Sequence, residues 1–164
     1  MTQALTLVDA SASDSGPATT HAPSADVAGL ARLPSEWQTI DHIVLDDVII
    51  DYVIVGPNGV FAISVDPDPA PATVEGDGLY RNGIRVTTTV KSAIMAAHEL
   101  RRRVGEQLFA YPLLVTAVAS VDQLGRLGVT PGHRIPEAIW SHVGSPLTRT
   151  QRMEITWALR SLAV

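Results

Sequence analysis

The chain has 164 residues, 46% of them hydrophobic, which is enough for one domain with a core of ordinary size. It contains no cysteine, which excludes disulfide bonds and thiolate metal sites, and no apolar run reaches the roughly 18 residues that a membrane span needs. The net charge of −5 disfavours broad electrostatic binding to DNA or RNA, although it leaves room for a local basic patch.

The composition also bears on where the protein works. Residues 1–17 have neither the basic residues nor the sustained apolar run of a secretory signal, and the lack of cysteine suits a reducing compartment. We therefore expect a cytoplasmic protein. Eleven arginines against a single lysine, Lys91, together with the alanine content, indicate a GC-rich bacterial genome.

The chain divides into a polar N-terminal segment and a folded remainder. Residues 1–25 are rich in Ala, Ser, Thr, Asp and Pro and show little periodicity, which predicts a disordered tail. Such a tail is either a solubilising leader or a tether for a partner. The folded domain is expected over residues 26–164.

The first half of that domain is expected to be a short helix followed by a hairpin. Residues 26–33 predict the helix, with Asp26 as its N-cap, and Pro34 ends it. Residues 37–45 alternate apolar and polar and predict a strand, and the β-branched run 48–55 predicts a strand buried on both faces. In the turn 56–59, Pro57 presets φ, Asn58 tolerates the left-handed region and Gly59 permits positive φ, and the turn leads to a return strand over 60–65.

Three short strands and a long helix are expected next. Residues 66–72 alternate Asp, Pro and Ala and cannot pair as an interior strand, whereas 73–75, 79–81 and 84–86 predict short strands, the last two joined by a tight Asn82-Gly83 turn. Residues 88–107 have the helical period. Its expected face is Val90, Ala93, Ile94, Ala97, Leu100, Arg101 and Val104.

The C-terminal third is expected to hold a central strand and two helices. Residues 111–120 predict the strand, 121–134 a glycine-rich loop, and 136–143 a short helix with Pro136 in its first turn. Thr148 and Gln151 form a capping-box pattern that starts the last helix. Its apolar content is Met153, Ile155, Trp157, Leu159 and Leu162. Trp140 and Trp157 are expected in the core or at an interface.

Residues 50–63, Ile-Asp-Tyr-Val-Ile-Val-Gly-Pro-Asn-Gly-Val-Phe-Ala-Ile, carry a resemblance to a known family. An Asp, a hydrophobic strand and a Gly-Pro-x-Gly-Val-Phe hairpin resemble the signature of the nuclease-related domain (NERD) family. Looser similarity extends over about residues 30–164. The resemblance implies an α/β, restriction-endonuclease-like fold, a mixed β-sheet flanked by helices.

The resemblance also implies a cutting site, and the reason is chemical. The family follows the hairpin with Glu-x-Lys. Two carboxylates near the end of a hairpin hold a divalent cation such as Mg²⁺ or Mn²⁺, which polarises the phosphate and lowers the pKa of a bound water. The Lys, two residues beyond the Glu and on the same face of the strand, stabilises developing charge.

This chain keeps one of the implied residues and lacks the others. Asp51 matches the family's Asp, and taken alone it is either a metal ligand or a carboxylate retained for structure. Ser64 and Asp66 stand in place of the Glu and the Lys, and Ser92 stands where the family has a helical Gln. The predicted N-terminal helix contains no Glu. These departures predict a catalytically inactive domain that needs no cofactor.

Three hypotheses remain open at this stage: an inactive binding module, a nuclease with relocated ligands, and a plain structural domain that resembles the family only in topology. In the second hypothesis, Asp51, Asp66 and Lys91 form a relocated site that binds Mg²⁺ or Mn²⁺, and the domain is an active metal-dependent nuclease. Otherwise, Asp66 and its neighbours form an ordinary exposed turn.

The run Arg101, Arg102 and Arg103 is either a weak contact surface for a nucleic acid or another partner, or a solvated face partly paired with Glu99 and Glu106. The leading hypothesis is a binding or scaffolding module. A protein partner is slightly favoured by the acidic balance, and DNA stays possible.

Overall fold

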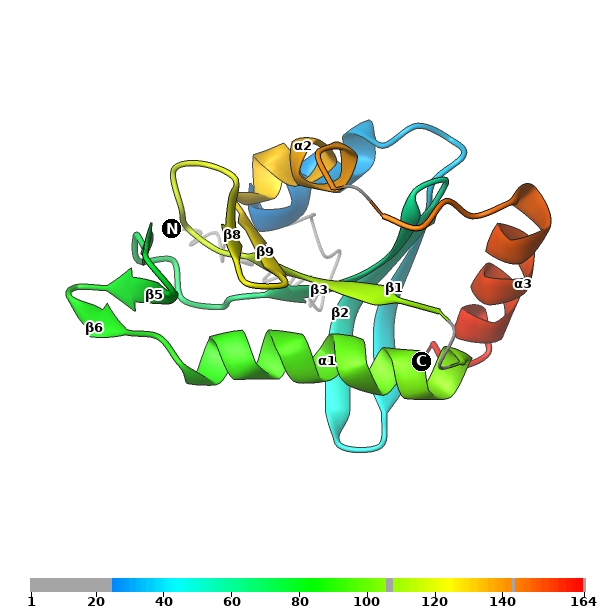
Figure 1. Ribbon diagram of the computed structural model, residues 1–164, viewed down its shortest axis with the longest axis horizontal. Coiled ribbons are helices and arrows are strands. Elements are labelled where there is room, and N and C mark those ends of the chain that lie inside the picture. The colour runs from blue at the N-terminus through cyan, green and yellow to red at the C-terminus, as the bar shows by residue number, and fades with distance from the viewer. Residues whose placement is uncertain (1–24, 106–107, 143, 164) are drawn as a thin grey trace, which may run out of the picture.

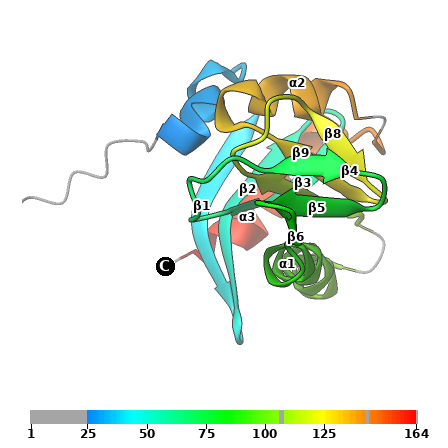
Figure 2. The same cartoon turned by 90° about the vertical axis from the view of Figure 1, so that its left-hand side faces the viewer.

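The computed structural model describes residues 25–105, 108–142 and 144–163. The predicted disordered tail lies outside these residues except for Ala25. A central mixed sheet has helices on both faces, as Figures 1 and 2 show, with α2 on one side and α1 on the other. The mixed α/β class expected from the sequence, with a sheet flanked by helices, is confirmed.

Six strands form the main sheet in the order β1-β2-β3-β7-β9-β8. They are β1 (Gln38–Leu45), β2 (Val48–Gly56), β3 (Gly59–Val65), β7 (Ala110–Val115), β9 (Leu127–Thr130) and β8 (Asp122–Leu124). β1, β2 and β3 are antiparallel neighbours, and β3 runs parallel to β7 and β7 to β9. β8 closes the far edge antiparallel to β9. The predicted β2–β3 hairpin therefore lies in the middle of the chain's largest sheet.

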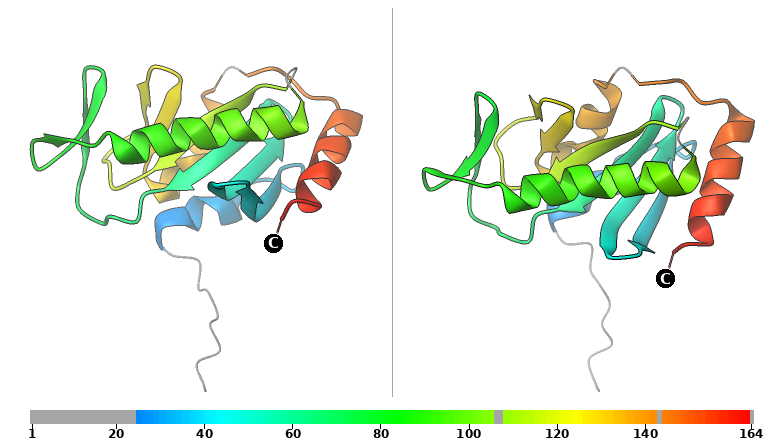
Figure 3. Two further views of the ribbon diagram at one scale, coloured as in Figure 1. Left: turned by 90° about the horizontal axis from the view of Figure 1, so that it is seen from below. Right: turned by 60° about the horizontal axis from the view of Figure 1, so that its bottom comes forward.

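A second, three-stranded sheet follows β3 and precedes the long helix. It consists of β4 (Thr73–Glu75), β5 (Gly78–Arg81) and β6 (Ile84–Arg85), all antiparallel. Figure 3 shows it beyond one end of α1, away from α3. Asn82 and Gly83 both have positive φ, 52° and 73°, so the predicted tight turn between β5 and β6 is confirmed.

The helices and 3₁₀ helices are η1 (Ala25–Arg32), α1 (Thr88–Val104), η2 (Gly132–Arg134), α2 (Ile135–Trp140) and α3 (Arg149–Arg160). Residues 106 and 107, where the long helix was expected to end, lie outside the described residues. The first helix is 3₁₀ and not α, with a break at Val27 (φ −129°, ψ 20°). The capping box of Thr148 and Gln151 is present at the start of α3.

Two large hydrophobic clusters lie on opposite faces of the main sheet. One packs Ala96, Ala97 and Leu100 of α1 and Leu159 of α3 against strands β1, β2 and β3. The other packs α2 and Trp37 against Phe61 and Ile63. A third joins the small sheet and α1 to β7, β8 and β9. The small aliphatic side chains thus fill the core, as the low aromatic content requires.

Several element predictions were wrong, each for a local reason. Residues 121–134 are not a loop, because Leu124, Leu127 and Val129 are buried in the β8–β9 hairpin and Gly125 (φ 59°) makes its turn. The strand predicted over 111–120 ends at Val115. Ile94 is 46% exposed, so the buried face of α1 is formed by Ala93, Ala96, Ala97 and Leu100 instead.

The hairpin and tryptophan predictions also need correction. Gly59 has the positive φ that was expected of it (141°), whereas Asn58 has none. The Asn58 amide instead donates to the carbonyl oxygens of Ile139 and His142. Strand β2 is buried on both faces only from Val53 onward. Trp140 and Trp157 are 55% and 78% exposed, so their placement in the core is wrong, and their placement at an interface stays a prediction.

No helix in the described ranges is long and apolar enough to cross a bilayer.

Candidate functional site

Asp51 lies in the middle of β2, where that strand separates from β3. The last paired residues of the β2–β3 ladder are Tyr52 and Ile63. Just beyond them, Oδ2 of Asp51 accepts a hydrogen bond of 2.7 Å from the backbone N–H of Val65. The half-buried carboxylate thereby accepts a backbone hydrogen bond at a point where the β2–β3 ladder supplies no acceptor. The structure thus gives Asp51 a backbone-binding role at the position of the implied metal ligand.

The surroundings of Asp51 are also irregular on the β1 side. Asp41 pairs with Tyr52 and Ile43 with Ile50, so His42 lies opposite Asp51, with a strained φ of 51°. Burial of the Tyr52 phenol, and then the negative charges of Asp51 and Asp41, raise its pKa above 10.0. This part of the sheet is therefore acidic and holds Tyr52 neutral.

Asp66, the residue in place of the implied Lys, lies at the end of β3 and is buried. Its Oδ2 accepts from Nη2 of Arg81 at 2.6 Å and from the Thr116 hydroxyl at 2.9 Å. Its Oδ1 accepts from the backbone N–H of Asp68 at 3.1 Å. The exposed-turn interpretation holds for Pro67, Asp68 and Pro69 but is wrong for Asp66, which is 6% exposed.

Arg81, on β5, completes this cluster. Its Nε donates to the carbonyl oxygen of Ala70 at 3.1 Å, and its Nη1 lies 3.3 Å from Oδ2 of Asp68. Burial opposes ionisation of Asp66, but the hydrogen bonds from Arg81, Asp68 and Thr116 outweigh it and lower the pKa of Asp66 below 3.8. Asp66 is thus an ionised carboxylate whose charge Arg81 balances.

The other expected site residues do not join this cluster. Ser64 is half-buried on β3, between Asp51 and Asp66 along the hairpin, and its hydroxyl makes no hydrogen bond to any described residue. Lys91 and Ser92 are exposed on the first turns of α1. Within residues 25–105, 108–142 and 144–163, Lys91 pairs with no carboxylate, and no group of three or more His, Asp or Glu could hold a metal ion.

The three consecutive arginines of α1 point to different partners. Arg102 pairs with Glu99 at 2.9 Å, as expected, and Arg103 pairs with Asp46 of the β1–β2 turn at 3.2 Å. The guanidinium of Arg101 lies 5.5 Å from the centre of the Phe109 ring. Successive residues of a helix are about 100° apart, so the run does not form one continuous basic face. The proposed pairing with Glu106 lies outside the described residues.

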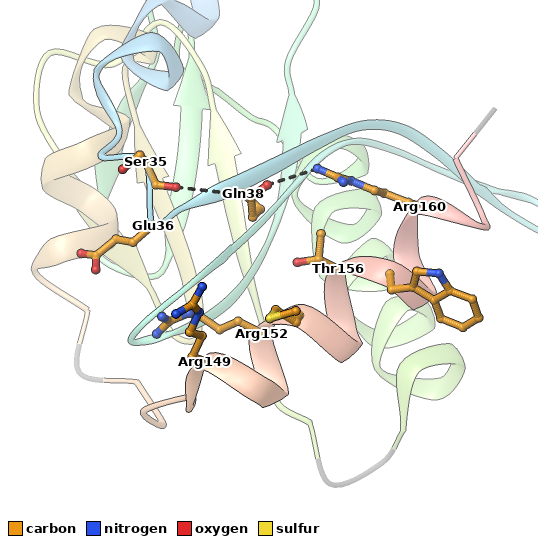
Figure 4. A pocket seen from close by; sticks show the side chains of 9 residues that line it. Ser35, Glu36, Gln38, Arg149, Arg152, Thr156 and Arg160 are labelled. Atoms are coloured by element: carbon orange, nitrogen blue, oxygen red, sulfur yellow. Dashed lines mark hydrogen bonds between the residues drawn. The ribbon is translucent and has the colours of Figure 1, made fainter.

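A groove beside α3 is a second candidate site. Ser35, Glu36 and Gln38 line one side, and the outer face of α3 from Arg149 to Arg160 lines the other, which we call the α3 groove. It encloses about 580 Å³. Figure 4 shows Arg149 and Arg152 together at one end and Arg160 at the other, with Gln38 and Thr156 between them. Sequence reasoning missed this site.

A signal for the groove was present in the helix periodicity. Ile155, Leu159 and Leu162 are spaced i, i+4, i+7 and pack on the core. Met153 and Trp157 share the spacing i, i+4 but lie on another face, and they are exposed. Arg81 and Thr116, by contrast, had no sequence signal, because they lie 15 and 50 residues from Asp66.

No family model, curated protein or solved structure with which the chain was compared matches it.

Proposed function

We propose that this chain is a catalytically inactive domain of the nuclease-related (NERD) type that works in the cytoplasm as a binding or scaffolding module for a protein partner. The observation that carries the proposal is the buried ion pair of Asp66 with Arg81 at the end of β3. In an active family member the same strand end is expected to present a Lys to the phosphate. Here it presents a carboxylate whose charge is already balanced.

The residues around the ion pair support the same proposal. Asp51 uses one carboxylate oxygen to bind the backbone N–H of Val65, which stabilises the hairpin. Ser64 supplies only a neutral hydroxyl, a weak ligand for a hard divalent cation. A set of Asp51, Asp66 and Lys91 would need Asp66 to leave Arg81, and the largely buried guanidinium would then lose its closest charge partner.

A plasmid-nicking assay tests the proposal. The full chain is incubated with supercoiled plasmid and Mg²⁺ or Mn²⁺ beside Asp51→Asn, which keeps an acceptor for Val65 while removing the charge. We expect both proteins to leave the plasmid supercoiled. Metal-dependent nicking by the parent chain that Asp51→Asn abolishes would establish the relocated nuclease site instead.

A further inference from the structure

Three arginines of the α3 groove lack the carboxylate partners that other arginines have. Arg152 donates to the Leu147 carbonyl oxygen at 3.1 Å, and Arg160 donates to Oε1 of Gln38 at 3.1 Å. Neither these two nor Arg149 forms an ion pair with any described residue. Elsewhere in the described chain, carboxylates pair with Arg81, Arg85, Arg102, Arg103 and Arg134. The groove is thus a local excess of positive charge on an acidic protein.

Large apolar side chains lie between these arginines. Met153 is 64% exposed and Trp157 is 78% exposed, one helical turn apart on the outer face of α3. Tryptophan, methionine and arginine are the residues that protein interfaces concentrate, and tryptophan and arginine supply most of the strong contacts there. Because Met153 and Trp157 are both exposed beside three arginines, we favour a protein surface as the occupant of the α3 groove.

The groove has a definite length and one unsatisfied polar group. Arg149 and Arg160 are eleven residues apart on one helix, which corresponds to roughly 16 Å along its axis. Between them, the Thr156 hydroxyl is covered and has no hydrogen-bond partner among the described residues. The covered hydroxyl is out of reach of an occupant. The arginines alone set the shape of the occupant, which needs to be extended, with anionic groups toward its ends.

We propose that the α3 groove binds an acidic segment of a partner protein, with carboxylates that pair with Arg149, Arg152 and Arg160 and an apolar side chain that packs on Met153 and Trp157. This inference rests on the proposed binding function and names the chemistry of the partner. Pairing three guanidinium groups with carboxylates gives charge-assisted hydrogen bonds, the strong kind, in a partly dry groove.

A peptide fits the groove better than a nucleic acid does. Glu36 on the groove opposes any anion, so it does not separate the two kinds of partner, but the protein's net charge of −5 repels a long polyanion as a whole. Nucleic-acid interfaces are much more positively charged than protein interfaces, whereas this surface combines three arginines with two large apolar side chains. A short acidic peptide meets the arginines without spreading charge over the acidic remainder.

Fluorescence anisotropy at low ionic strength tests the inference. The probe is fluorescein-labelled Glu-Glu-Leu-Leu-Glu-Glu, whose outer residues lie roughly 16 Å apart when extended. Its matched control replaces every Glu by Gln. The protein variants are the pair R149E/R160E and, as a control with the same change in net charge, R102E/R103E on α1. Trp157→Ala tests the apolar contact without a charge change.

We expect the acidic peptide to bind, and both the Gln peptide and R149E/R160E to weaken binding by about tenfold or more. Trp157→Ala weakens it as well, and R102E/R103E leaves it unchanged. Circular dichroism confirms that the variants fold, and if R149E/R160E does not, Trp157→Ala and the Gln peptide still decide the outcome.

Four results would overturn the inference. They are no binding of the acidic peptide at low salt, equal loss in R102E/R103E, tighter binding of single-stranded oligothymidylate through the same arginines, and self-association of the chain that Trp157→Ala abolishes. If the acidic peptide does not bind and the plasmid stays supercoiled, only the proposed partner of the α3 groove is contradicted. Plasmid nicking by the parent chain removes the proposed function, whatever the peptide does.

Discussion

Asp66 and Arg81 form the contact on which the proposal of an inactive domain rests. The side chains are 2% and 11% exposed, and their closest atoms lie 2.6 Å apart. A buried ion pair is stable only while both charges are present. Removal of one charge destabilises the fold, because the other charge then lacks both water and its main partner. The pair also connects the end of β3 to β5, so it joins the main sheet to the small one.

We predict that Asp66→Ala lowers the free energy of unfolding by about 3 kcal/mol, since it leaves the largely buried Arg81 with only the half-exposed Asp68 carboxylate, at 3.3 Å, as a charge partner. The matched control is Asp68→Ala, which removes a second carboxylate near Arg81 that is 48% exposed. That change should cost about 1 kcal/mol or less. Urea denaturation of both variants measures the difference. Equal losses would mean that Asp66 contributes no more than a surface charge.

The pH dependence of stability follows from the lowered pKa of Asp66. A carboxyl with a folded-state pKa below its unfolded value stabilises the fold above the unfolded value, and this contribution is lost as pH falls through the folded pKa. We therefore predict that the stability gap between the parent chain and Asp66→Asn is full near neutral pH and shrinks as pH falls below 3.8. Denaturation midpoints of both proteins across that range measure the gap. A gap independent of pH would contradict the ionised state of Asp66.

Among the elements, the β2–β3 hairpin does most to position the candidate site. Its strands and turn were predictable, because a β-branched run, a Pro-Asn-Gly turn and a second apolar run are strong local signals. The role of Asn58 was not predictable. Its side chain binds the end of α2, a contact made 81 and 84 residues away along the chain.

Helix α3 packs one face on the core and exposes another, and its start has one side-chain cap. The Thr148 hydroxyl accepts from the backbone N–H of Gln151 at 3.2 Å, and the Gln151 side chain accepts from the Thr148 N–H at 2.9 Å. We predict that Thr148→Ala costs about 1 kcal/mol of unfolding free energy. Thr150→Ala, two residues on and exposed in the same turn, makes the same chemical change without touching the cap. Thermal denaturation of the two variants separates them, and an equal effect would show that the cap contributes nothing.

The sequence did not reveal the β8–β9 hairpin or the two separate apolar faces of α3. In the β8–β9 hairpin the strands are three and four residues long, too short for a period to show among glycines. On α3 the apolar residues were counted as one set, although Met153 and Trp157 lie on a different face from Leu159. Local pattern identified most of the longer elements but not the short β8–β9 strands, and the tertiary contacts decided which residues were buried.

At the scale of the whole molecule, charge is unevenly distributed. The net charge of −5 contrasts with the three arginines gathered at the α3 groove, and most other arginines are paired. Asp51, Ser64 and Asp66 could be selected from the sequence through a family resemblance. Their actual partners, and the groove, depend on which distant segments the fold brings together.

The measurement that tests the central claim most directly is a calorimetric titration of Mn²⁺ into the full chain. Because Asp51 binds the Val65 backbone and Arg81 balances Asp66, these two carboxylates do not form a free pair for a hard cation. We predict no saturable heat of binding, and the same result for Asp51→Ala. Stoichiometric binding that Asp51→Ala abolishes and Asp68→Ala preserves would contradict the claim that the nuclease-type site has become a structural ion pair.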